Sequence, residues 1–439
     1  MLKCAFYEKE ITPPIGDGMP GYFDKNRICI GVLDRLYAKA VVFDDGHDCV
    51  VMLVIDAVTI PDEYCAQLKK EIEKNTGIPG DRVAVCATHS HYGIPCGESF
   101  GVEADEEFMK VLCRLASDCV VLAIEKLQPC RIRFASGHLY DTSFNRDYVL
   151  DDGRIMTNPA PEFRDRIVRH YAGIDPNLPA ILIENEEGEK IGAVYSFACH
   201  QDTVKKPFYT GDYSSVVSKD LKAEFGQEFV AIYLAGASGD LTHRDFIAMT
   251  RDENYKVPDY HTIGHRIAAE LLRAVRQDSE LIQAEEIHSA HEKVTCRYRR
   301  ATKEEIEKAE AVVSGKIEDK NQMLGAIHSQ LLLQYEAKMK DMNQEYGHLE
   351  IQVFAIGSVL LYVMPGELYH QFGLELRAGS TQEQVIIATN CNGTGGYIPV
   401  PELFGTSVYP VQLCDESKWA PETGALLTKR ALALSKELQ

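Results

Sequence analysis

Short apolar runs, each ended by a polar residue, recur along the chain and predict buried strands. The clearest unit joins an apolar run at 50–55, a helical stretch at 62–75 that begins at Asp62, stop signals at Gly77 and Pro79, and a second apolar run at 83–87. A strand, a helix and a strand in this order predict a parallel pair. Further runs rich in β-branched and aromatic residues predict strands at 193–198, 229–235, 359–364 and 385–388.

Helical patterns alternate with these strands, at 107–127, 214–225, 261–276 and 370–377. The charged segment 302–343 begins with a capping box of Thr302 and Glu305, which predicts one or two solvated helices that act as scaffold or lid. We therefore expect a mixed α/β fold, with a largely parallel sheet as its core, flanking helices, and an active site at the carboxyl ends of the strands.

Neither an internal repeat nor a linker rich in Pro, Gly and Ser separates two folding units, so we expect residues 1–439 to form a single domain. The composition, 45% hydrophobic and 26% charged, is ordinary for a globular protein. Asp and Glu number 66 against 46 Lys and Arg, and no basic run is longer than a pair. This balance disfavours binding to nucleic acid and to anionic membranes.

The thirteen cysteines are scattered without a Cys-x-x-Cys pair, and several lie in apolar runs. Buried, reduced thiols explain this usage better than disulfides or a thiolate zinc site. The N-terminus carries charge where a signal peptide needs an apolar stretch, and no apolar run is long enough to cross a membrane. We therefore expect a cytoplasmic protein without stable membrane insertion.

The residues that follow the apolar runs carry the candidate chemistry, because ligands of open α/β sheets bind outside the carboxyl ends of the strands. If the strands are parallel neighbours, these residues share one rim. They are Asp56, Thr88–His91, His200, Gly236–Asp240, Glu367 and Asn390–Tyr397.

Two histidines and a carboxylate on one rim form a ligand set that suits Zn²⁺ and leaves a position open for water. His89 and His91 are the best candidates from spacing, because residues i and i+2 of an extended segment point to one face. The alternative is that these histidines are hydrogen-bonded structural residues. In the loop after the fourth strand, Asp240 is expected to accept a hydrogen bond from a ligating histidine.

Two other constellations are weaker. His261 and His265 share a helical face, but Thr262 stands where the zincin pattern requires Glu, so helix surface is the preferred interpretation. Ser238 is a conceivable nucleophile, yet the Gly-x-Ser-x-Gly pattern is absent. The loop around Ser238 also lacks the spacing of nucleotide-binding loops.

In these and further motifs the chain resembles the catalytic domain of the neutral/alkaline, non-lysosomal ceramidases, zinc amidases that hydrolyse N-acyl sphingosine. The resemblance extends over almost the whole chain, and its motifs follow in the family's order. Each motif is weak by itself, whereas the ordered set is specific. The motifs are Ile11–Pro14, Pro20–Tyr22, Asp34–Lys39, Ala87–His91, Phe144–Arg146, Phe197–His200, Gly239–Asp240, Pro365–Glu367 and Gly396–Ile398.

The resemblance implies a set of site residues. The family's zinc ligands fall on His89, His200, Glu367 and Tyr397. His91 matches a histidine that polarises the substrate, and the active-site arginine and tyrosine fall on Arg146 and Tyr409. Tyr397, Arg146 and Tyr409 come from the resemblance alone.

This set implies hydrolysis of an amide by a zinc-activated water, with His91 and Tyr409 as candidate donors to the oxyanion. Arg146 stays protonated and would orient the substrate or stabilise charge. The general base is left open between Glu367 and His91.

The chain also departs from the family. Tyr92 and Ile94 replace smaller or different residues of its histidine motif, so an N-acyl compound smaller or more polar than ceramide is an alternative substrate. We expect no C-terminal immunoglobulin-like domain. The alternative functions are an esterase or carbohydrate N-deacetylase on the same scaffold, and a catalytically inactive binding protein.

Overall fold

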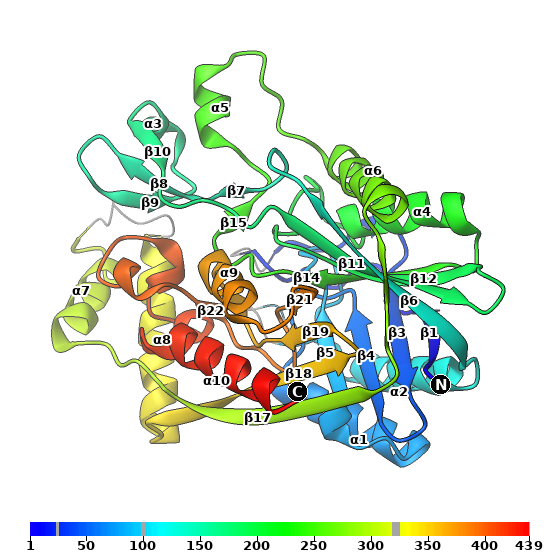
Figure 1. Ribbon diagram of the computed structural model, residues 1–439. Helices are drawn as coiled ribbons and strands as arrows, with labels where there is room; N and C mark the ends of the chain where they lie inside the picture. The colour runs from blue at the N-terminus through cyan, green and yellow to red at the C-terminus, as the bar shows by residue number, and fades with distance from the viewer. Residues whose placement is uncertain (23–25, 98–101, 103, 318–324, 439) are drawn as a thin grey trace.

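The computed structural model describes residues 1–22, 26–97, 102, 104–317 and 325–438, and arranges them in four layers, helices on either side of two packed sheets (Figure 1). Nine of the described strands form the larger sheet, in which β16 (Glu280–Ile282) pairs with β6 beside the main order. That order is β14 (Val230–Ala235), β12 (Lys190–Phe197), β11 (Asn177–Asn185), β6 (Gln128–His138), β1 (Lys3–Glu10), β3 (Tyr37–Asp44), β4 (Cys49–Ile55) and β5 (Val83–Ala87).

The second sheet packs face to face on the first. It contains β17 (Ile287–Arg297), β18 (Tyr346–Ile356), β19 (Val359–Val363) and β21 (Val385–Ala388). One apolar cluster fills the interface, with Met52 and Val54 of β4 on one side and Leu361 and Val363 of β19 on the other. The alternate residues of β4 face the helices instead, which explains why this strand is an unbroken apolar run.

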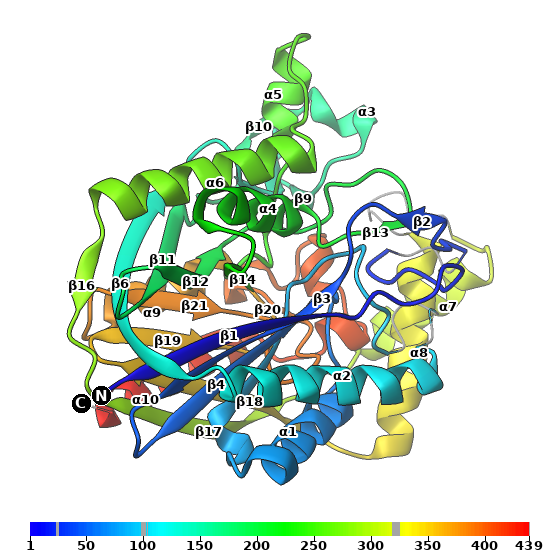
Figure 2. The same cartoon turned by 90° about the vertical axis from the view of Figure 1, so that its right-hand side faces the viewer.

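Helices cover both outer faces of the packed sheets (Figures 1 and 2). The helices α1 (Asp62–Thr76) and α2 (Glu106–Ile124) pack on the β3–β4–β5 part of the larger sheet, and α4 (Tyr213–Phe225) and α6 (Tyr260–Gln277) on β11, β12 and β14. The second sheet is covered by α9 (His370–Gly379) and α10 (Thr423–Glu437). The predicted strands and helices are therefore present, with boundaries shifted by a few residues.

Short elements at one end of the sheets hold the site loops. Single pairs are formed by β2 (Gly31–Val32) with β13 (Phe208–Tyr209), β7 (Phe144–Asn145) with β15 (Leu241–Thr242), and β20 (Glu367–Leu368) with β22 (Tyr397–Ile398). Beside them lie a small sheet and two short helices, namely β8 (Asp147–Leu150), β9 (Ile155–Thr157), β10 (Ile167–His170), α3 (Pro161–Arg164) and α5 (Phe246–Arg251).

The mixed α/β class is confirmed, but the expectation of a largely parallel sheet is wrong. In the larger sheet only β4–β5 and β12–β14 are parallel among the described pairs, and the others are antiparallel. Short turns join β3 to β4 and β11 to β12, and such connections allow only antiparallel pairing. The predicted β4–α1–β5 crossover is indeed parallel.

The charged segment 302–343 contains α7 (Lys303–Val313) and α8 (Ala326–Met342), and the predicted capping box of Thr302 and Glu305 opens α7. Residues 318–324 of this segment lie outside the described residues. All thirteen cysteines are free, as expected for reduced thiols. Within the described ranges, no helix combines the length and the apolar composition needed to cross a bilayer.

Candidate functional site

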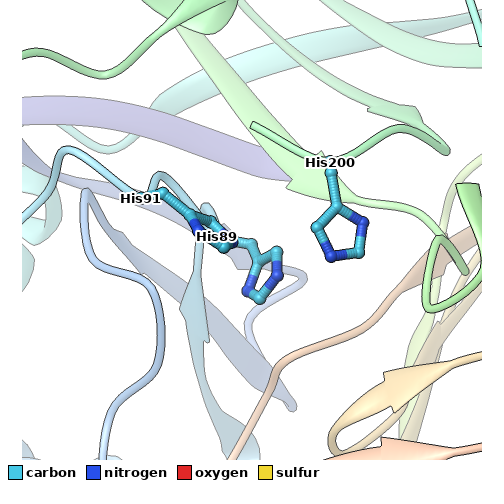
Figure 3. Close-up of side chains that lie close together, drawn as sticks. All are labelled: His89, His91 and His200. Carbon is cyan, nitrogen blue, oxygen red and sulfur yellow. The ribbon is translucent and has the colours of Figure 1, made fainter. Parts of the chain in front are cut away.

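Three histidines from two distant loops meet at the carboxyl ends of β5 and β12 (Figure 3). The ring centroid of His89 lies 5.0 Å from that of His91 and 4.9 Å from that of His200. One nitrogen from each ring lies within 4.8 Å of the other two. The predicted shared rim is therefore present for these residues.

The local geometry differs from the prediction for His89 and His91. His89 has a φ of 63°, so the segment is not extended and the i, i+2 argument does not apply. The two rings are nearly perpendicular, at 89°, and still face the same space. A turn after β5 brings them together, a feature without a clear signal in residue spacing.

Glu367 completes the cluster. Its Oε2 lies 3.2 Å from Nε2 of His200 and 3.4 Å from Nε2 of His89. The residue lies on β20, which pairs in parallel with β22 so that Glu367 is opposite Tyr397. This pairing brings two residues thirty positions apart to one point.

Backbone carbonyls orient the two outer imidazoles. Nδ1 of His89 donates to the carbonyl of Val58 at 2.9 Å, and Nδ1 of His200 donates to the carbonyl of Ser238 at 3.0 Å. Because a carbonyl only accepts, each Nδ1 carries a proton, and each Nε2 points toward Glu367. Such hydrogen bonds fix the tautomer of metal-binding histidines.

The expectation that Asp240 would support a ligating histidine is wrong. Its carboxylate accepts from Nδ1 of His370 at 2.6 Å and from Asn145 at 2.8 Å. The carbonyl of Ser238, two positions earlier, takes the expected role for His200. A backbone acceptor needs no particular side chain, so the sequence could not identify it.

The cluster fits a divalent cation. Nε2 of His89 and Oε2 of Glu367 are buried and have no hydrogen-bond partner among the described residues. Burial alone would raise the pKa of Glu367, but the two imidazoles outweigh burial and hold it well below its usual range. A buried carboxylate needs a compensating positive charge, and two Nε2 atoms with one carboxylate oxygen are typical zinc ligands.

His91 is buried beside the same space, but its hydrogen bonding differs from that of His89 and His200. In the described structure neither of its ring nitrogens has a hydrogen-bond partner. Burial, followed by the neighbouring His89 charge, lowers the pKa of His91 to about 3. Its ring is therefore neutral near pH 7, with one N–H donor and one lone pair available to the site.

Tyr397, Arg146 and Tyr409 lie beside Glu367, as the resemblance implies. The Arg146 guanidinium lies 5.2 Å from the ring centre of Tyr397, and the ring of Tyr409 lies 5.4 Å from that of Tyr397. Arg146 is buried, bonds the carbonyl of Gly239, and places Nη1 3.4 Å from Nε2 of His200. Burial, then Glu367, raises the pKa of Tyr397, so its phenol is protonated in the protein alone.

Two polar residues near the histidines, Asp202 and His243, were not identified as site residues from the sequence. The Asp202 carboxylate accepts from Nδ1 of His243 at 3.1 Å. Asp202 follows His200 by two positions, which was the available signal. By contrast, His261 and His265 lie on the exposed face of α6, and His265 bonds Asp220, in line with the preferred surface interpretation.

Comparisons with known proteins support the family that the sequence motifs indicate. The model of the family described as neutral/alkaline non-lysosomal ceramidase, N-terminal, matches residues 7–244, more than half of the chain. Neutral ceramidase A of Dictyostelium discoideum is 28% identical over 204 residues, and neutral ceramidase of Pseudomonas aeruginosa is 25% identical over 198 residues. These alignments cover 44% and 43% of this chain but only 27% and 28% of the relatives' own lengths.

The fold comparison extends over nearly the whole chain. The crystal structure of neutral ceramidase from Pseudomonas aeruginosa superposes with a TM-score of 0.74, covering 99% of this chain and 74% of that one at 19% identity. At this identity the likeness establishes the fold, which includes the C-terminal segment that holds Glu367, Tyr397 and Tyr409.

Proposed function

The chain belongs to the neutral/alkaline non-lysosomal ceramidase family, and from this premise we propose that it is a zinc-dependent amidohydrolase that cleaves an N-acyl bond. His89, His200, Glu367 and Tyr397 would hold the metal. One observation carries the proposal: two buried Nε2 atoms, fixed by backbone carbonyls, converge on a buried carboxylate. Among the described residues Nε2 of His89 has no hydrogen-bond partner, as expected for a ring nitrogen available to a metal.

When bound, zinc supplies a Lewis acid that polarises a carbonyl and lowers the pKa of a water molecule. Side chains of the protein would orient the substrate and stabilise the developing negative charge. His91 is neutral and buried, so its N–H can donate to a carbonyl oxygen as negative charge develops there. Arg146 keeps its charge and orients the substrate, and Tyr409 offers a second donor from the other side of Tyr397.

Two groups are placed to accept the proton of the attacking water. Glu367 is ionised, and His91 carries a free lone pair. Both lie beside the same space. The leaving amine takes its proton from whichever group received it.

The side chains beside His91 are compatible with a compact or polar substrate as an alternative to ceramide. The Tyr22 and Tyr92 hydroxyls bond each other at 2.8 Å, and Arg27 lies over both rings. Arg27 also donates to the carbonyl of His91 at 3.0 Å. A half-buried wall of two hydroxyls and a guanidinium favours hydrogen-bonding groups near the scissile bond.

A turnover panel tests the proposed function. Purified protein, zinc-replete or treated with a chelator, is given N-acylsphingosine, an N-acylethanolamine, an N-acetylated amino sugar and a fatty-acid ester. We expect amide hydrolysis that the chelator abolishes and zinc restores, with about one zinc per chain. Hydrolysis of the ester alone would favour the esterase alternative, deacetylation of the sugar alone the N-deacetylase, and no turnover with zinc bound an inactive binding protein.

A further inference from the structure

A pocket of about 550 Å³ opens beside the histidine cluster, between α5 and the start of α6, the two helices in the upper part of Figure 1. Its volume is in the range that small ligands occupy. The lining residues are Leu33, Arg164, Thr203–Phe208 without Pro207, His243, Arg244, Phe246, Met249 and Val257–Tyr260. A cavity of similar volume lies between α1 and α2, lined by Glu71 and Asp118 among others; neither lining includes His89, His91 or His200, but Thr203 of the first pocket follows His200 by three positions.

One wall of this pocket is the same segment that supports the histidine cluster. The carbonyl of Gln201 accepts from the backbone N–H of His91 at 3.0 Å, and the carbonyl of Val204 accepts from the Tyr92 hydroxyl. Thr203 and Val204 then line the pocket. The short segment 201–204 therefore both contacts the His91 segment and lines the pocket.

The wall of the pocket at His243 is also connected to the histidine cluster. His243 lines the pocket and bonds Asp202 at 3.1 Å, and the negative charge of Asp202 acts on His91. Asp202 thus interacts with both the pocket residue His243 and the histidine cluster. A molecule held in this pocket would lie next to the proposed reaction centre.

The lining combines apolar side chains with a basic rim. Phe208, Phe246 and Met249 supply part of the apolar surface. The rim carries four cations, and in the described part of the chain none of them forms an ion pair. They are Arg164, Lys205, Lys206 and Arg244.

This rim is unusual for a chain whose formal net charge is −20. One acidic residue, Asp259, also lies in the lining, where its carboxylate caps α6 by accepting from the N–H and hydroxyl of Thr262 at 2.8 Å each. Four cations against one carboxylate give the lining a net positive charge, which attracts an anion.

We propose that this pocket binds an apolar chain that carries an anionic group, and that the substrate is accordingly an N-acyl compound with a carboxylate, sulfonate or phosphate. The second half of this inference rests on the proposed function, whereas the binding does not. The apolar walls take the chain and the basic rim takes the charge, which a neutral N-acyl compound would leave unused.

Binding is measured first, by calorimetric titration of the full chain with monomeric dodecanoate and with dodecan-1-ol. Dodecanoate should bind at least about fivefold more tightly than dodecan-1-ol, because each of several exposed cations adds a small favourable contribution to the binding free energy of the anion. The Lys205→Gln/Lys206→Gln variant should lose most of this preference. The matched control, Lys429→Gln/Lys436→Gln on the exposed face of α10, should keep it.

Titrations at different salt concentrations, and with a chelator present, show whether the carboxylate of dodecanoate binds at the basic rim or at the metal centre. The preference should shrink as ionic strength rises, because exposed charges are screened, and should persist with a chelator present. Equal affinity for the two probes, an unchanged preference in Lys205→Gln/Lys206→Gln, or a preference lost with the chelator would each overturn the proposal. The last result would mean that the carboxylate binds at the metal centre.

Exposed Ile30, Val32 and Leu33 lie on or beside β2, next to this pocket, so a membrane surface is the rival ligand. If Lys205→Gln/Lys206→Gln weakens binding to vesicles of anionic phospholipid but not to monomeric dodecanoate, the rim serves membrane contact and the pocket proposal is wrong.

Turnover then separates this inference from the proposed function. Wild type should hydrolyse N-dodecanoylglycine with a higher kcat/KM than N-dodecanoylethanolamine, and Lys205→Gln/Lys206→Gln should remove the difference. Hydrolysis of both at equal rates overturns the anionic substrate. Binding of dodecanoate as expected, without hydrolysis of any amide, contradicts the proposed function and leaves the ligand class of the pocket standing.

Discussion

At the scale of single residues, His91 differs from His89 and His200 because no carbonyl fixes its ring among the described residues. Both of its nitrogens are buried and unpaired there. A ligand held for metal binding usually has its second nitrogen oriented by a neighbour. This difference supports a donor role for His91 and a ligand role for the other two histidines.

The first prediction compares His91→Ala with His89→Ala. If His91 acts on developing charge, His91→Ala should keep zinc near one equivalent and lower kcat roughly a hundredfold to a thousandfold, the usual loss for one oxyanion donor. His89→Ala should lose metal and activity together. Zinc analysis and steady-state kinetics provide the readouts. A metal-free His91→Ala protein would make His91 a ligand, and an ordinary kcat would make it structural.

A second prediction concerns the buried pair of His370 and Asp240, joined at 2.6 Å. Burial alone would lower the pKa of His370, but Asp240 outweighs it and raises the pKa above the usual 6.5. The folded state then holds the proton more tightly than the unfolded chain. Its contribution is complete below about pH 6.5 and is lost as pH rises through the pKa of the folded state.

His370→Gln should therefore destabilise the protein by roughly 3 kcal/mol near pH 6 and by progressively less at higher pH, since one partner of a buried charged pair is removed. Thermal unfolding from pH 6 to 9 measures the gap to wild type. The control is His265→Gln, an exposed histidine paired with Asp220, which should change stability little at any pH. A gap that widens with pH would contradict the assignment.

At the scale of elements, the pairing of β20 with β22 decides whether Glu367 and Tyr397 meet. The backbones approach closely at Gly366, where φ is 66° and an added Cβ would lie 2.5 Å from the carbonyl oxygen of Gly396. Glycine is needed there both for the left-handed conformation and for space. Metal binding by Glu367 and Tyr397 would therefore depend on the close contact between the loops that contain Gly366 and Gly396.

Gly366→Ala should therefore lower both stability and zinc content, while Gly405→Ala should lower stability alone. Gly405 also has a positive φ, 87°, but nothing lies within 4 Å of its added Cβ. We expect a cost of about 1 kcal/mol for Gly405→Ala from backbone strain, and at least about twice that for Gly366→Ala. Zinc content and chemical denaturation test this, and equal effects of the two variants would refute it.

At the scale of the whole molecule, single-domain organisation stays a prediction, as does a cytoplasmic location. Support for the former comes from the core between the two sheets, which joins residues from Leu2 to Cys391. The antiparallel pairing of β1 with β6 likewise ties the N-terminal strand to a distant segment. Few places exist where the chain could divide without breaking this core.

Calorimetry should accordingly give one unfolding transition, with the calorimetric and van't Hoff enthalpies equal. Limited proteolysis should first cut within 302–343, outside both sheets. Two separable transitions, or two stable fragments divided near the middle of the chain, would show more than one folding unit.

The sequence by itself determined much of this protein. Unbroken apolar runs identified strands buried on both faces, and the polar residues that end them identified His89, His91, His200 and Glu367 before any contact was known. These features are local, because burial and strand ends leave a pattern in neighbouring residues. Tyr397, Arg146 and Tyr409 needed the order of family motifs, since an isolated tyrosine or arginine carries no such pattern.

Only the tertiary structure decided the rest. It made most of the larger sheet antiparallel, gave His200 a carbonyl acceptor in place of Asp240, and gathered a basic rim from separate segments of an acidic chain. Strand direction, backbone acceptors and local charge all depend on which distant segments become neighbours. Net charge and residue spacing average over the chain or describe its nearest positions, so neither contains that information.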